Sequence, residues 1–239
     1  MAMTDFWRQM VGAHEPVSKE FEHLLMREVM RTELVRVRAL IIVALVMLFN
    51  ISFVRLVFPG VEERIWRGTN PNAIFLILTV FILFECWVHS AITRHLKLDQ
   101  DVHILRRYVG ALIETSIPTM ILSLQIQSMG PVQALGFVMP LTYFIFIILS
   151  TLRLDFWLSA FTGFVAAAAL FALAMYHKAP VSPDGEPEIY YHFTRSLVLF
   201  ACGILAGIVG VQLRRSFAAS LRAATARDRI TNLFGQHVS

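Results

Sequence analysis

Six long apolar runs dominate the sequence, and each is long enough to cross a lipid bilayer as a helix. A helix rises about 1.5 Å per residue, so a hydrocarbon core about 30 Å thick needs roughly 20 apolar residues. Hydrophobic residues make up 56% of the 239 residues and charged residues only 16%, against about 25% charged in soluble domains. We therefore predict an all-α membrane protein with six transmembrane helices, at residues 39–58, 73–92, 108–127, 132–151, 156–176 and 194–213.

The basic residues gather on one side of these predicted spans. Sixteen of the 21 lysines and arginines lie before span one, between spans two and three, between spans four and five, or after span six. Because cytoplasmic loops are enriched in Lys and Arg, this asymmetry predicts that both termini are cytoplasmic. It also explains the net charge of +4 without a nucleic-acid partner. We expect a multi-pass protein of a cell inner membrane, with the lipid bilayer as its first partner.

Three parts follow from this division of the chain: residues 1–36, a membrane domain at 37–213, and residues 214–239. In the first part, Phe21, Leu25 and Val29 recur at helical spacing among charged residues, which predicts an amphipathic helix over residues 17–37. Such a helix either contacts a cytoplasmic partner or second subunit, or lies on the anionic inner leaflet. The sequence leaves both alternatives open.

The third part predicts that the last span continues into the cytoplasm as a helix. A narrow apolar stripe of Leu213, Phe217, Leu221 and Ala224 keeps the spacing of a short coiled coil, and no helix-breaking residue occurs before Gly235. A span that continues as a stiff rod can transmit motion to a domain beyond it. The alternative is a juxtamembrane anchor whose arginines hold phospholipid head groups.

The end of the chain, residues 229–239, contains a Phe-Gly-x-x-Val-Ser segment formed by Phe234, Gly235, Val238 and Ser239. With the six spans and the helix before it, this segment resembles the approach to the catalytic domain in bacterial membrane-bound class III adenylate cyclases. The resemblance implies a linker to an output domain. The chain would then be a membrane anchor and regulatory domain that couples a membrane or small-ligand signal, of unknown identity, to cAMP synthesis.

The same resemblance implies a homodimer, because members of this family form their active sites at a dimer interface. It assigns no catalytic residue here, since the family's metal-binding aspartates, purine-selecting pair and transition-state Asn and Arg have no counterpart in this chain. ATP with Mg or Mn is implied only for the cytoplasmic cyclase domain of a full-length protein. Two other classes remain open: a small transporter or channel, and the sensor half of another signalling enzyme such as a histidine kinase or diguanylate cyclase.

Two acidic residues lie inside predicted spans, where an ionised carboxylate costs at least a few kcal/mol and usually faces the protein interior. Glu85 in span two and Glu114 in span three reach a similar depth, and His89 follows Glu85 by one helical turn. We expect Glu85, His89 and Glu114 to form one cluster. It would serve either as an intramembrane proton, cation or ligand site, or as a hydrogen-bonded group that gives packing specificity alone.

Histidine placement argues against a haem between facing spans, because His89 is the one histidine well inside a predicted span. Cys86 and Cys202 both fall inside spans, so neither a disulfide framework nor a cysteine metal motif is expected. We predict no cofactor and no metal in this chain.

Small residues in span six predict close helix packing. Gly203 and Gly207 form a GxxxG pattern that Gly210 extends, and such a face lets two membrane helices approach closely. We expect it to lie either at a dimer axis above the cytoplasmic rod or against another span of the same subunit. Pro118 and Pro140 are expected to kink spans three and four.

Overall fold

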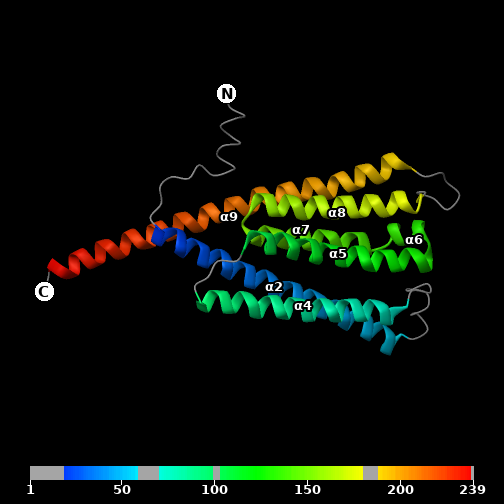
Figure 1. The fold of residues 1–239 in the computed structure, drawn as a ribbon, viewed down its shortest axis with the longest axis horizontal. Helices are drawn as coiled ribbons and strands as arrows, with labels where there is room; N and C mark the ends of the chain where they lie inside the picture. Colours follow the sequence, from blue (N-terminus) through cyan, green and yellow to red (C-terminus); the bar gives the residue numbers. More distant parts are fainter. Residues whose placement is uncertain (1–18, 59–69, 99–102, 180–187, 238–239) are drawn as a thin grey trace, which may run out of the picture.

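The apolar runs form helices that lie side by side along one direction (Figure 1). The structure is a computed structural model that describes residues 19–58, 70–98, 103–179 and 188–237. All regular structure in these ranges is helical. The helices are α2 (Lys19–Val57), α4 (Pro71–Leu98), α5 (Ile104–Met129), α6 (Pro131–Gly136), α7 (Thr142–Ser150), α8 (Phe156–Tyr176) and α9 (Ile189–His237), with two short 3₁₀ helices, η1 (Met139–Leu141) and η2 (Thr151–Arg153).

Five of the described helices, α2, α4, α5, α8 and α9, are long and apolar enough to cross a membrane. The prediction of an all-helical fold is confirmed for the described residues and these five helices are compatible with a membrane protein, but a sixth continuous span is not found there. Residues 132–151 divide into α6, a bend, η1 and α7, which leaves a shorter apolar stretch at Met139–Arg153. Pro140 lies at the break. Its backbone nitrogen carries no hydrogen and cannot donate a hydrogen bond, and its ring disfavours helical geometry in the residue before it.

The predicted N-terminal amphipathic helix is not a separate element, because its residues from Lys19 onward continue directly into the first span within α2. Val29, Met30 and Val37 are buried in the bundle, as are the charged Glu33 and Arg36. A helix lying on the membrane surface would not bury these side chains. The predicted division between residues 36 and 37 therefore falls within one continuous helix; residues 1–18 lie outside the described ranges.

Helix α9 runs unbroken for 49 residues, and Figure 1 shows that its C-terminal part projects beyond the bundle, at the end where α2 begins. Past Arg214 no proline interrupts the helix, and alanine and arginine, both good helix formers, predominate. The predicted stripe residues Leu213, Phe217, Leu221 and Ala224 all lie on this helix. So do Phe234 and Gly235 of the linker segment, whereas Val238 and Ser239 are outside the described residues.

The glycine face of α9 packs within the chain, against α8 and the turn before it. A Cβ atom added to Gly203 would lie 2.6 Å from the Cα of Gly163 on α8, closer than two carbon atoms can pack. A Cβ on Gly207 would meet Phe156, and one on Gly210 would lie 3.0 Å from the Thr151 carbonyl oxygen. Of the two expected placements of Gly203, Gly207 and Gly210, the structure shows packing against another helix of the same chain, and their small face is occupied by these intrachain contacts.

A tight turn joins η2 to α8 and fixes the direction of both. Leu154 is buried and has left-handed backbone dihedrals, φ 54° and ψ 29°, a conformation that is strained for a residue with a Cβ atom. Asp155 then caps α8, and its carboxylate accepts a hydrogen bond from the Leu158 backbone N–H at 3.1 Å. The cap offsets part of the strain and helps hold Arg153, two residues before Asp155, in the bundle.

Replacing Asp155 by alanine is expected to lower the free energy of unfolding by about 1 kcal/mol, because the first turn of α8 loses its side-chain cap. Equilibrium unfolding in mixed detergent micelles, followed by circular dichroism, measures the change. The matched variant Asp155→Asn keeps an accepting oxygen and should lose much less. Equal losses in the two variants would show that the charge of Asp155, and not its capping hydrogen bond, is what stabilises the turn.

Candidate functional site

Charged side chains from three separate parts of the chain meet inside the bundle. Arg36 on α2 donates from Nε to the Glu33 carboxylate at 2.8 Å and from Nη1 to the Glu114 carboxylate of α5 at 2.5 Å. Arg153 of η2 donates to the same Glu114 oxygen at 2.8 Å. Only 3% of Arg36 and 2% of Arg153 is exposed. One carboxylate therefore joins two buried guanidinium groups from distant segments.

A second set of contacts links α5 to η2. The Arg107 guanidinium donates to the Arg153 carbonyl oxygen at 2.9 Å and to Glu33 at 3.3 Å. In return, Arg153 donates to the Arg107 carbonyl oxygen at 3.1 Å. We call Glu33, Arg36, Arg107, Glu114 and Arg153 the ionic cluster; it ties α2, α5 and η2 together at the end of the bundle from which α9 projects.

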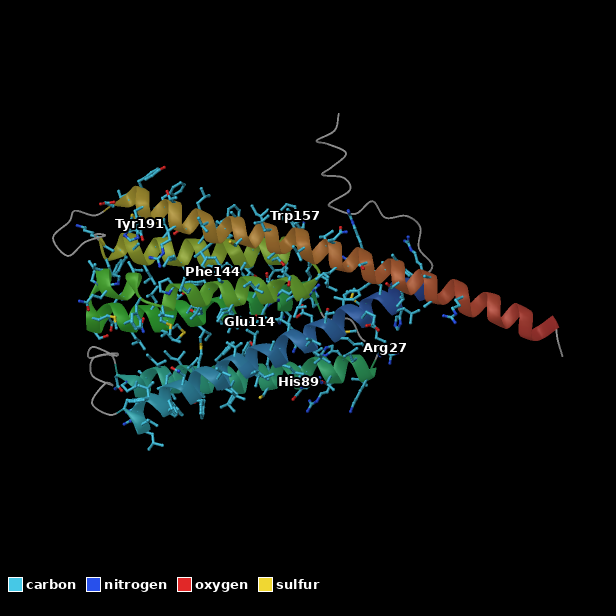
Figure 2. The ribbon with its side chains drawn as sticks, turned by 180° about the vertical axis from the view of Figure 1, so that it is seen from behind. Arg27, His89, Glu114, Phe144, Trp157 and Tyr191 are labelled. Atoms are coloured by element: carbon cyan, nitrogen blue, oxygen red, sulfur yellow. The ribbon has the colours of Figure 1, made fainter. Side chains whose placement is uncertain are left out.

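Local structure explains how these charges meet. Glu33 and Arg36 are three residues apart on α2, so they share one helix face. Glu114 lies seven residues after Arg107, two turns farther along the same face of α5. The turn through Leu154 directs Arg153 inward instead of toward solvent. Figure 2 shows Glu114 in the interior of the bundle.

Glu85 lies next to this cluster without joining it. Its side chain on α4 is 0% exposed, and neither carboxylate oxygen has a hydrogen-bond partner among the described residues. The charges of Glu114, Arg36 and Arg153 act on it electrostatically. Burying a carboxyl group without hydrogen bonds is costly, so Glu85 is the least satisfied acidic group of this region.

His89 makes a different contact from the one expected. The guanidinium Nε of Arg38 donates to His89 Nε2 at 3.3 Å, and His89 is partly exposed on α4 (Figure 2). Glu85 and Glu114 thus lie close enough for their charges to interact, whereas His89 pairs with a residue of α2. No group of three His, Cys, Asp or Glu residues in the described ranges could hold a metal ion.

Sequence reasoning identified Glu114 but missed its partners. Its partners Arg36 and Arg153 count only as cytoplasmic basic residues in the charge asymmetry, as does Arg107, which pairs with Glu33. Two features of the sequence could have indicated the cluster. A buried Glu114 needs cationic neighbours, and three arginines lie at the cytoplasmic margins of spans one, three and four. An arginine at a helix end near the membrane surface can bind lipid head groups or pair with an acidic residue inside the protein. The sequence alone does not distinguish these two roles.

A large cavity opens beside the ionic cluster, between α2, α4 and the first turns of α5. Its volume is about 760 Å³. All five residues of the ionic cluster line one part of it, together with Arg106 and His103, and apolar side chains line most of the remainder. These apolar residues include Val29 and Met30 of α2, Phe84 and Trp87 of α4, and Val109 and Ile113 of α5.

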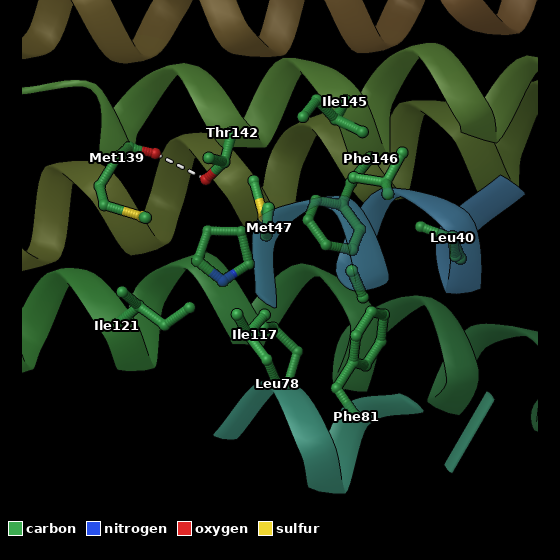
Figure 3. A pocket seen from close by; sticks show the side chains of 13 residues that line it. Leu40, Met47, Leu78, Phe81, Ile117, Ile121, Met139, Thr142, Ile145 and Phe146 are labelled. Carbon is green, nitrogen blue, oxygen red and sulfur yellow. Dashed lines mark hydrogen bonds between the residues drawn. The ribbon is translucent and has the colours of Figure 1, made fainter. Parts of the chain in front are cut away.

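A second cavity lies deeper in the bundle and is of another kind. It has a volume of about 20 Å³ and is lined by apolar side chains of α2, α4, α5 and α7 (Figure 3). The Thr142 hydroxyl on its wall already donates to the Met139 carbonyl oxygen at 2.6 Å. The space is large enough for one water molecule at most and offers it no free polar partners. This cavity is a packing gap between helices.

No protein-family model, curated protein or solved structure matches this chain. The resemblance to membrane-bound adenylate cyclases thus remains a prediction carried by residues 229–239. The structure itself adds two features that bear on function, the ionic cluster and the cavity beside it.

Proposed function

We propose that this chain is the membrane anchor and regulatory domain of a class III adenylate cyclase, and that α9 couples the bundle to the cytoplasmic cyclase domain. The observation that carries the proposal is the continuity of α9. The helix that packs on α8 in the bundle extends without a break to Phe234 and Gly235 of the linker segment. A shift or rotation of α9 among the spans is therefore transmitted along a stiff helix.

Helix α2 supports this role because it connects the ionic cluster to α9. Near the start of α2, the Phe21 ring lies 5.3 Å from the Arg222 guanidinium of α9, in a cation–π geometry. Glu33 and Arg36 lie on the same helix, three to four turns farther along. A change at the cluster that moves α2 therefore acts on the projecting part of α9.

A homodimer completes the proposed arrangement. Leu213 is 37% and Phe217 39% exposed, on the part of α9 that leaves the bundle, and with Leu221 and Ala224 they form the coiled-coil stripe. Two copies of α9 packed along this stripe would hold two cyclase domains together, as the family's shared active sites require. The proposal places the domain in a cell inner membrane with both termini cytoplasmic, and assigns ATP and Mg or Mn to the cyclase domain alone.

Changing the helical phase of α9 tests the proposal. A class III cyclase catalytic module is fused after Ser239, and cAMP is measured in a cyclase-deficient strain at matched membrane levels. One alanine inserted between Ala224 and Thr225, beyond the Phe21–Arg222 contact, rotates everything after it by about 100°. We expect cAMP production to fall at least tenfold, which corresponds to about 1.4 kcal/mol in the active-state equilibrium.

A seven-residue insertion at the same position is the matched control. It lengthens α9 but restores the phase to within about 20°, so cAMP production should stay within about threefold of the parent fusion. Equal output from the one-residue and seven-residue insertions would contradict coupling through a phased helix. It would leave α9 as a simple anchor.

A small transporter is the competing assignment, and the large cavity beside Glu85 and the ionic cluster favours it. It predicts that the chain by itself moves a solute across vesicles, independently of α9 beyond the bundle. The sensor half of a histidine kinase or diguanylate cyclase would share the coupling helix with our proposal. The identity of the output domain separates these signalling classes.

A further inference from the structure

The large cavity has the size of a site for a small organic molecule. Ligand sites typically have volumes of about 300–1,000 Å³, and this cavity has about 760 Å³. Trp87 and Leu105 on its walls are largely exposed, and Val109 is about half exposed. The cavity therefore opens between α4 and α5, on a surface that faces the bilayer in a membrane-spanning bundle. A molecule dissolved in the membrane has direct access to it.

The charges that line the cavity do not balance. Four arginines, Arg36, Arg106, Arg107 and Arg153, face two carboxylates, Glu33 and Glu114. An excess of two positive charges remains, and an ionised Glu85 behind the wall would reduce it to one. Because buried charges are stabilised by partners of opposite sign, the polar part of the cavity has the electrostatic character of an anion site.

Among the arginines that line the cavity, Arg106 has a buried donor atom without a hydrogen-bond partner in the described residues. Its Nη2 atom is buried and makes no hydrogen bond among the described residues. The guanidinium lies 5.3 Å from the centre of the Trp87 ring, so the side chain is held across the cavity between α5 and α4. Arg106 also lies in the first turn of α5, where the helix dipole favours negative charge. A buried donor without an acceptor points to an anionic group of a ligand.

We propose that this cavity binds a single-chain anionic amphiphile, of which a long-chain carboxylate is the simplest example. Its head group accepts hydrogen bonds from Arg106 beside the ionic cluster. Its alkyl chain lies along Phe84 and Trp87 of α4 and Val109 and Ile113 of α5. A two-chain phospholipid needs more volume than the cavity provides. This binding does not depend on the identity of the output domain and would hold for a transporter as well.

Fluorescence quenching in the full chain, purified in detergent micelles, tests the proposal. The probe is 9,10-dibromostearate, whose bromine atoms quench tryptophan on contact. We expect saturable quenching that disappears in Trp87→Phe, because Trp87 lines the cavity. Arg106→Gln should weaken the apparent affinity at least about tenfold, since a charge-assisted hydrogen bond is lost. Arg94→Gln, an exposed charge on α4 outside the cavity, should leave the affinity unchanged.

A variant that fills the cavity gives an independent test. Gly110 lines the cavity, and the nearest atom to an added Cβ is a Glu114 carboxylate oxygen at 3.8 Å, an ordinary contact. Gly110→Leu should therefore fold normally and abolish saturable quenching. Gly136→Leu is the matched control, because Gly136 on α6 is exposed and has no atom within 4 Å of an added Cβ.

Each remaining outcome decides against part of the proposal. Saturable quenching that survives Gly110→Leu would mean that the probe meets Trp87 from the micelle, which overturns the site. Equal affinity for the uncharged dibromostearyl alcohol would overturn the anionic head group. Tighter binding of brominated phosphatidylglycerol than of dibromostearate would overturn the single-chain ligand in favour of a membrane phospholipid. None of these results bears on coupling through α9, which the phase experiment tests separately.

Discussion

Replacing Glu114 by leucine is expected to lower the free energy of unfolding by about 3–5 kcal/mol, because it leaves buried guanidinium groups without their shared partner. Arg36 and Arg153 both donate to Glu114, at 2.5 and 2.8 Å, and both are almost fully buried. The cost comes from the uncompensated charges and not from the loss of packing, since leucine is close to glutamate in volume. Equilibrium unfolding in mixed detergent micelles measures it.

Glu85→Leu is the matched control, with the same change of side chain on the neighbouring helix. Glu85 is as buried as Glu114, but its oxygens have no hydrogen-bond partner in the described chain. Removing it breaks no ion pair and relieves an unsatisfied carboxyl group, so stability should change by less than about 1 kcal/mol or increase. If both variants lost stability equally, the ionic cluster would not be what distinguishes Glu114, and its assignment as the joint between helices would be wrong.

Replacing Gly203 by leucine is the second large effect, with an expected loss near or above the upper end of the roughly 1–3 kcal/mol range for overpacking. An added Cβ would lie 2.6 Å from the Gly163 Cα and 3.2 Å from the Ser159 carbonyl oxygen. These are backbone atoms of α8, so relief requires the two helices to separate. Gly163→Leu should produce a similar loss, because the contact is mutual.

Exposed Gly136 again provides the control, since Gly136→Leu introduces the same side chain where no atom lies within 4 Å of the added Cβ. Cysteine crosslinking along α9 distinguishes intrachain from dimer packing. If Gly203→Leu left unfolding unchanged and weakened only crosslinks between copies, the glycine face would belong to a dimer axis, contrary to the packing of α8 on α9 described above.

The fold was largely predictable because hydropathy decides which segments enter a membrane. Apolar runs near 20 residues identified α2, α4, α5, α8 and α9, and the absence of breakers after Arg214 predicted the extension of α9. Pro140 was expected only to kink its span, whereas the chain there divides into α6, η1 and α7. Pro118, expected to act alike, stays inside a continuous α5. A proline in an apolar run predicts a local disturbance, but whether the helix continues or ends there depends on tertiary packing, which a single sequence does not reveal.

The site was predictable only in part, because its composition depends on contacts between distant segments. An acidic residue within an apolar run is visible in the sequence, and Glu85 and Glu114 were identified in this way. The partners of Glu114 were not, since Arg36 and Arg153 lie 78 and 39 residues from it along the chain. His89 follows Glu85 at one turn, but packing against α2 gives it Arg38 as its partner instead. Helical spacing predicts neighbours on one helix and says little about the helix opposite.

The central claim is that this chain regulates a cyclase, and the most direct measurement is the sequence of the roughly 200 codons that follow Ser239 in the source gene, a length set by ordinary domain size. Our account predicts an open frame that encodes a class III catalytic module with two metal-binding aspartates. A stop codon directly after Ser239, or a frame that encodes an unrelated output domain, would contradict it.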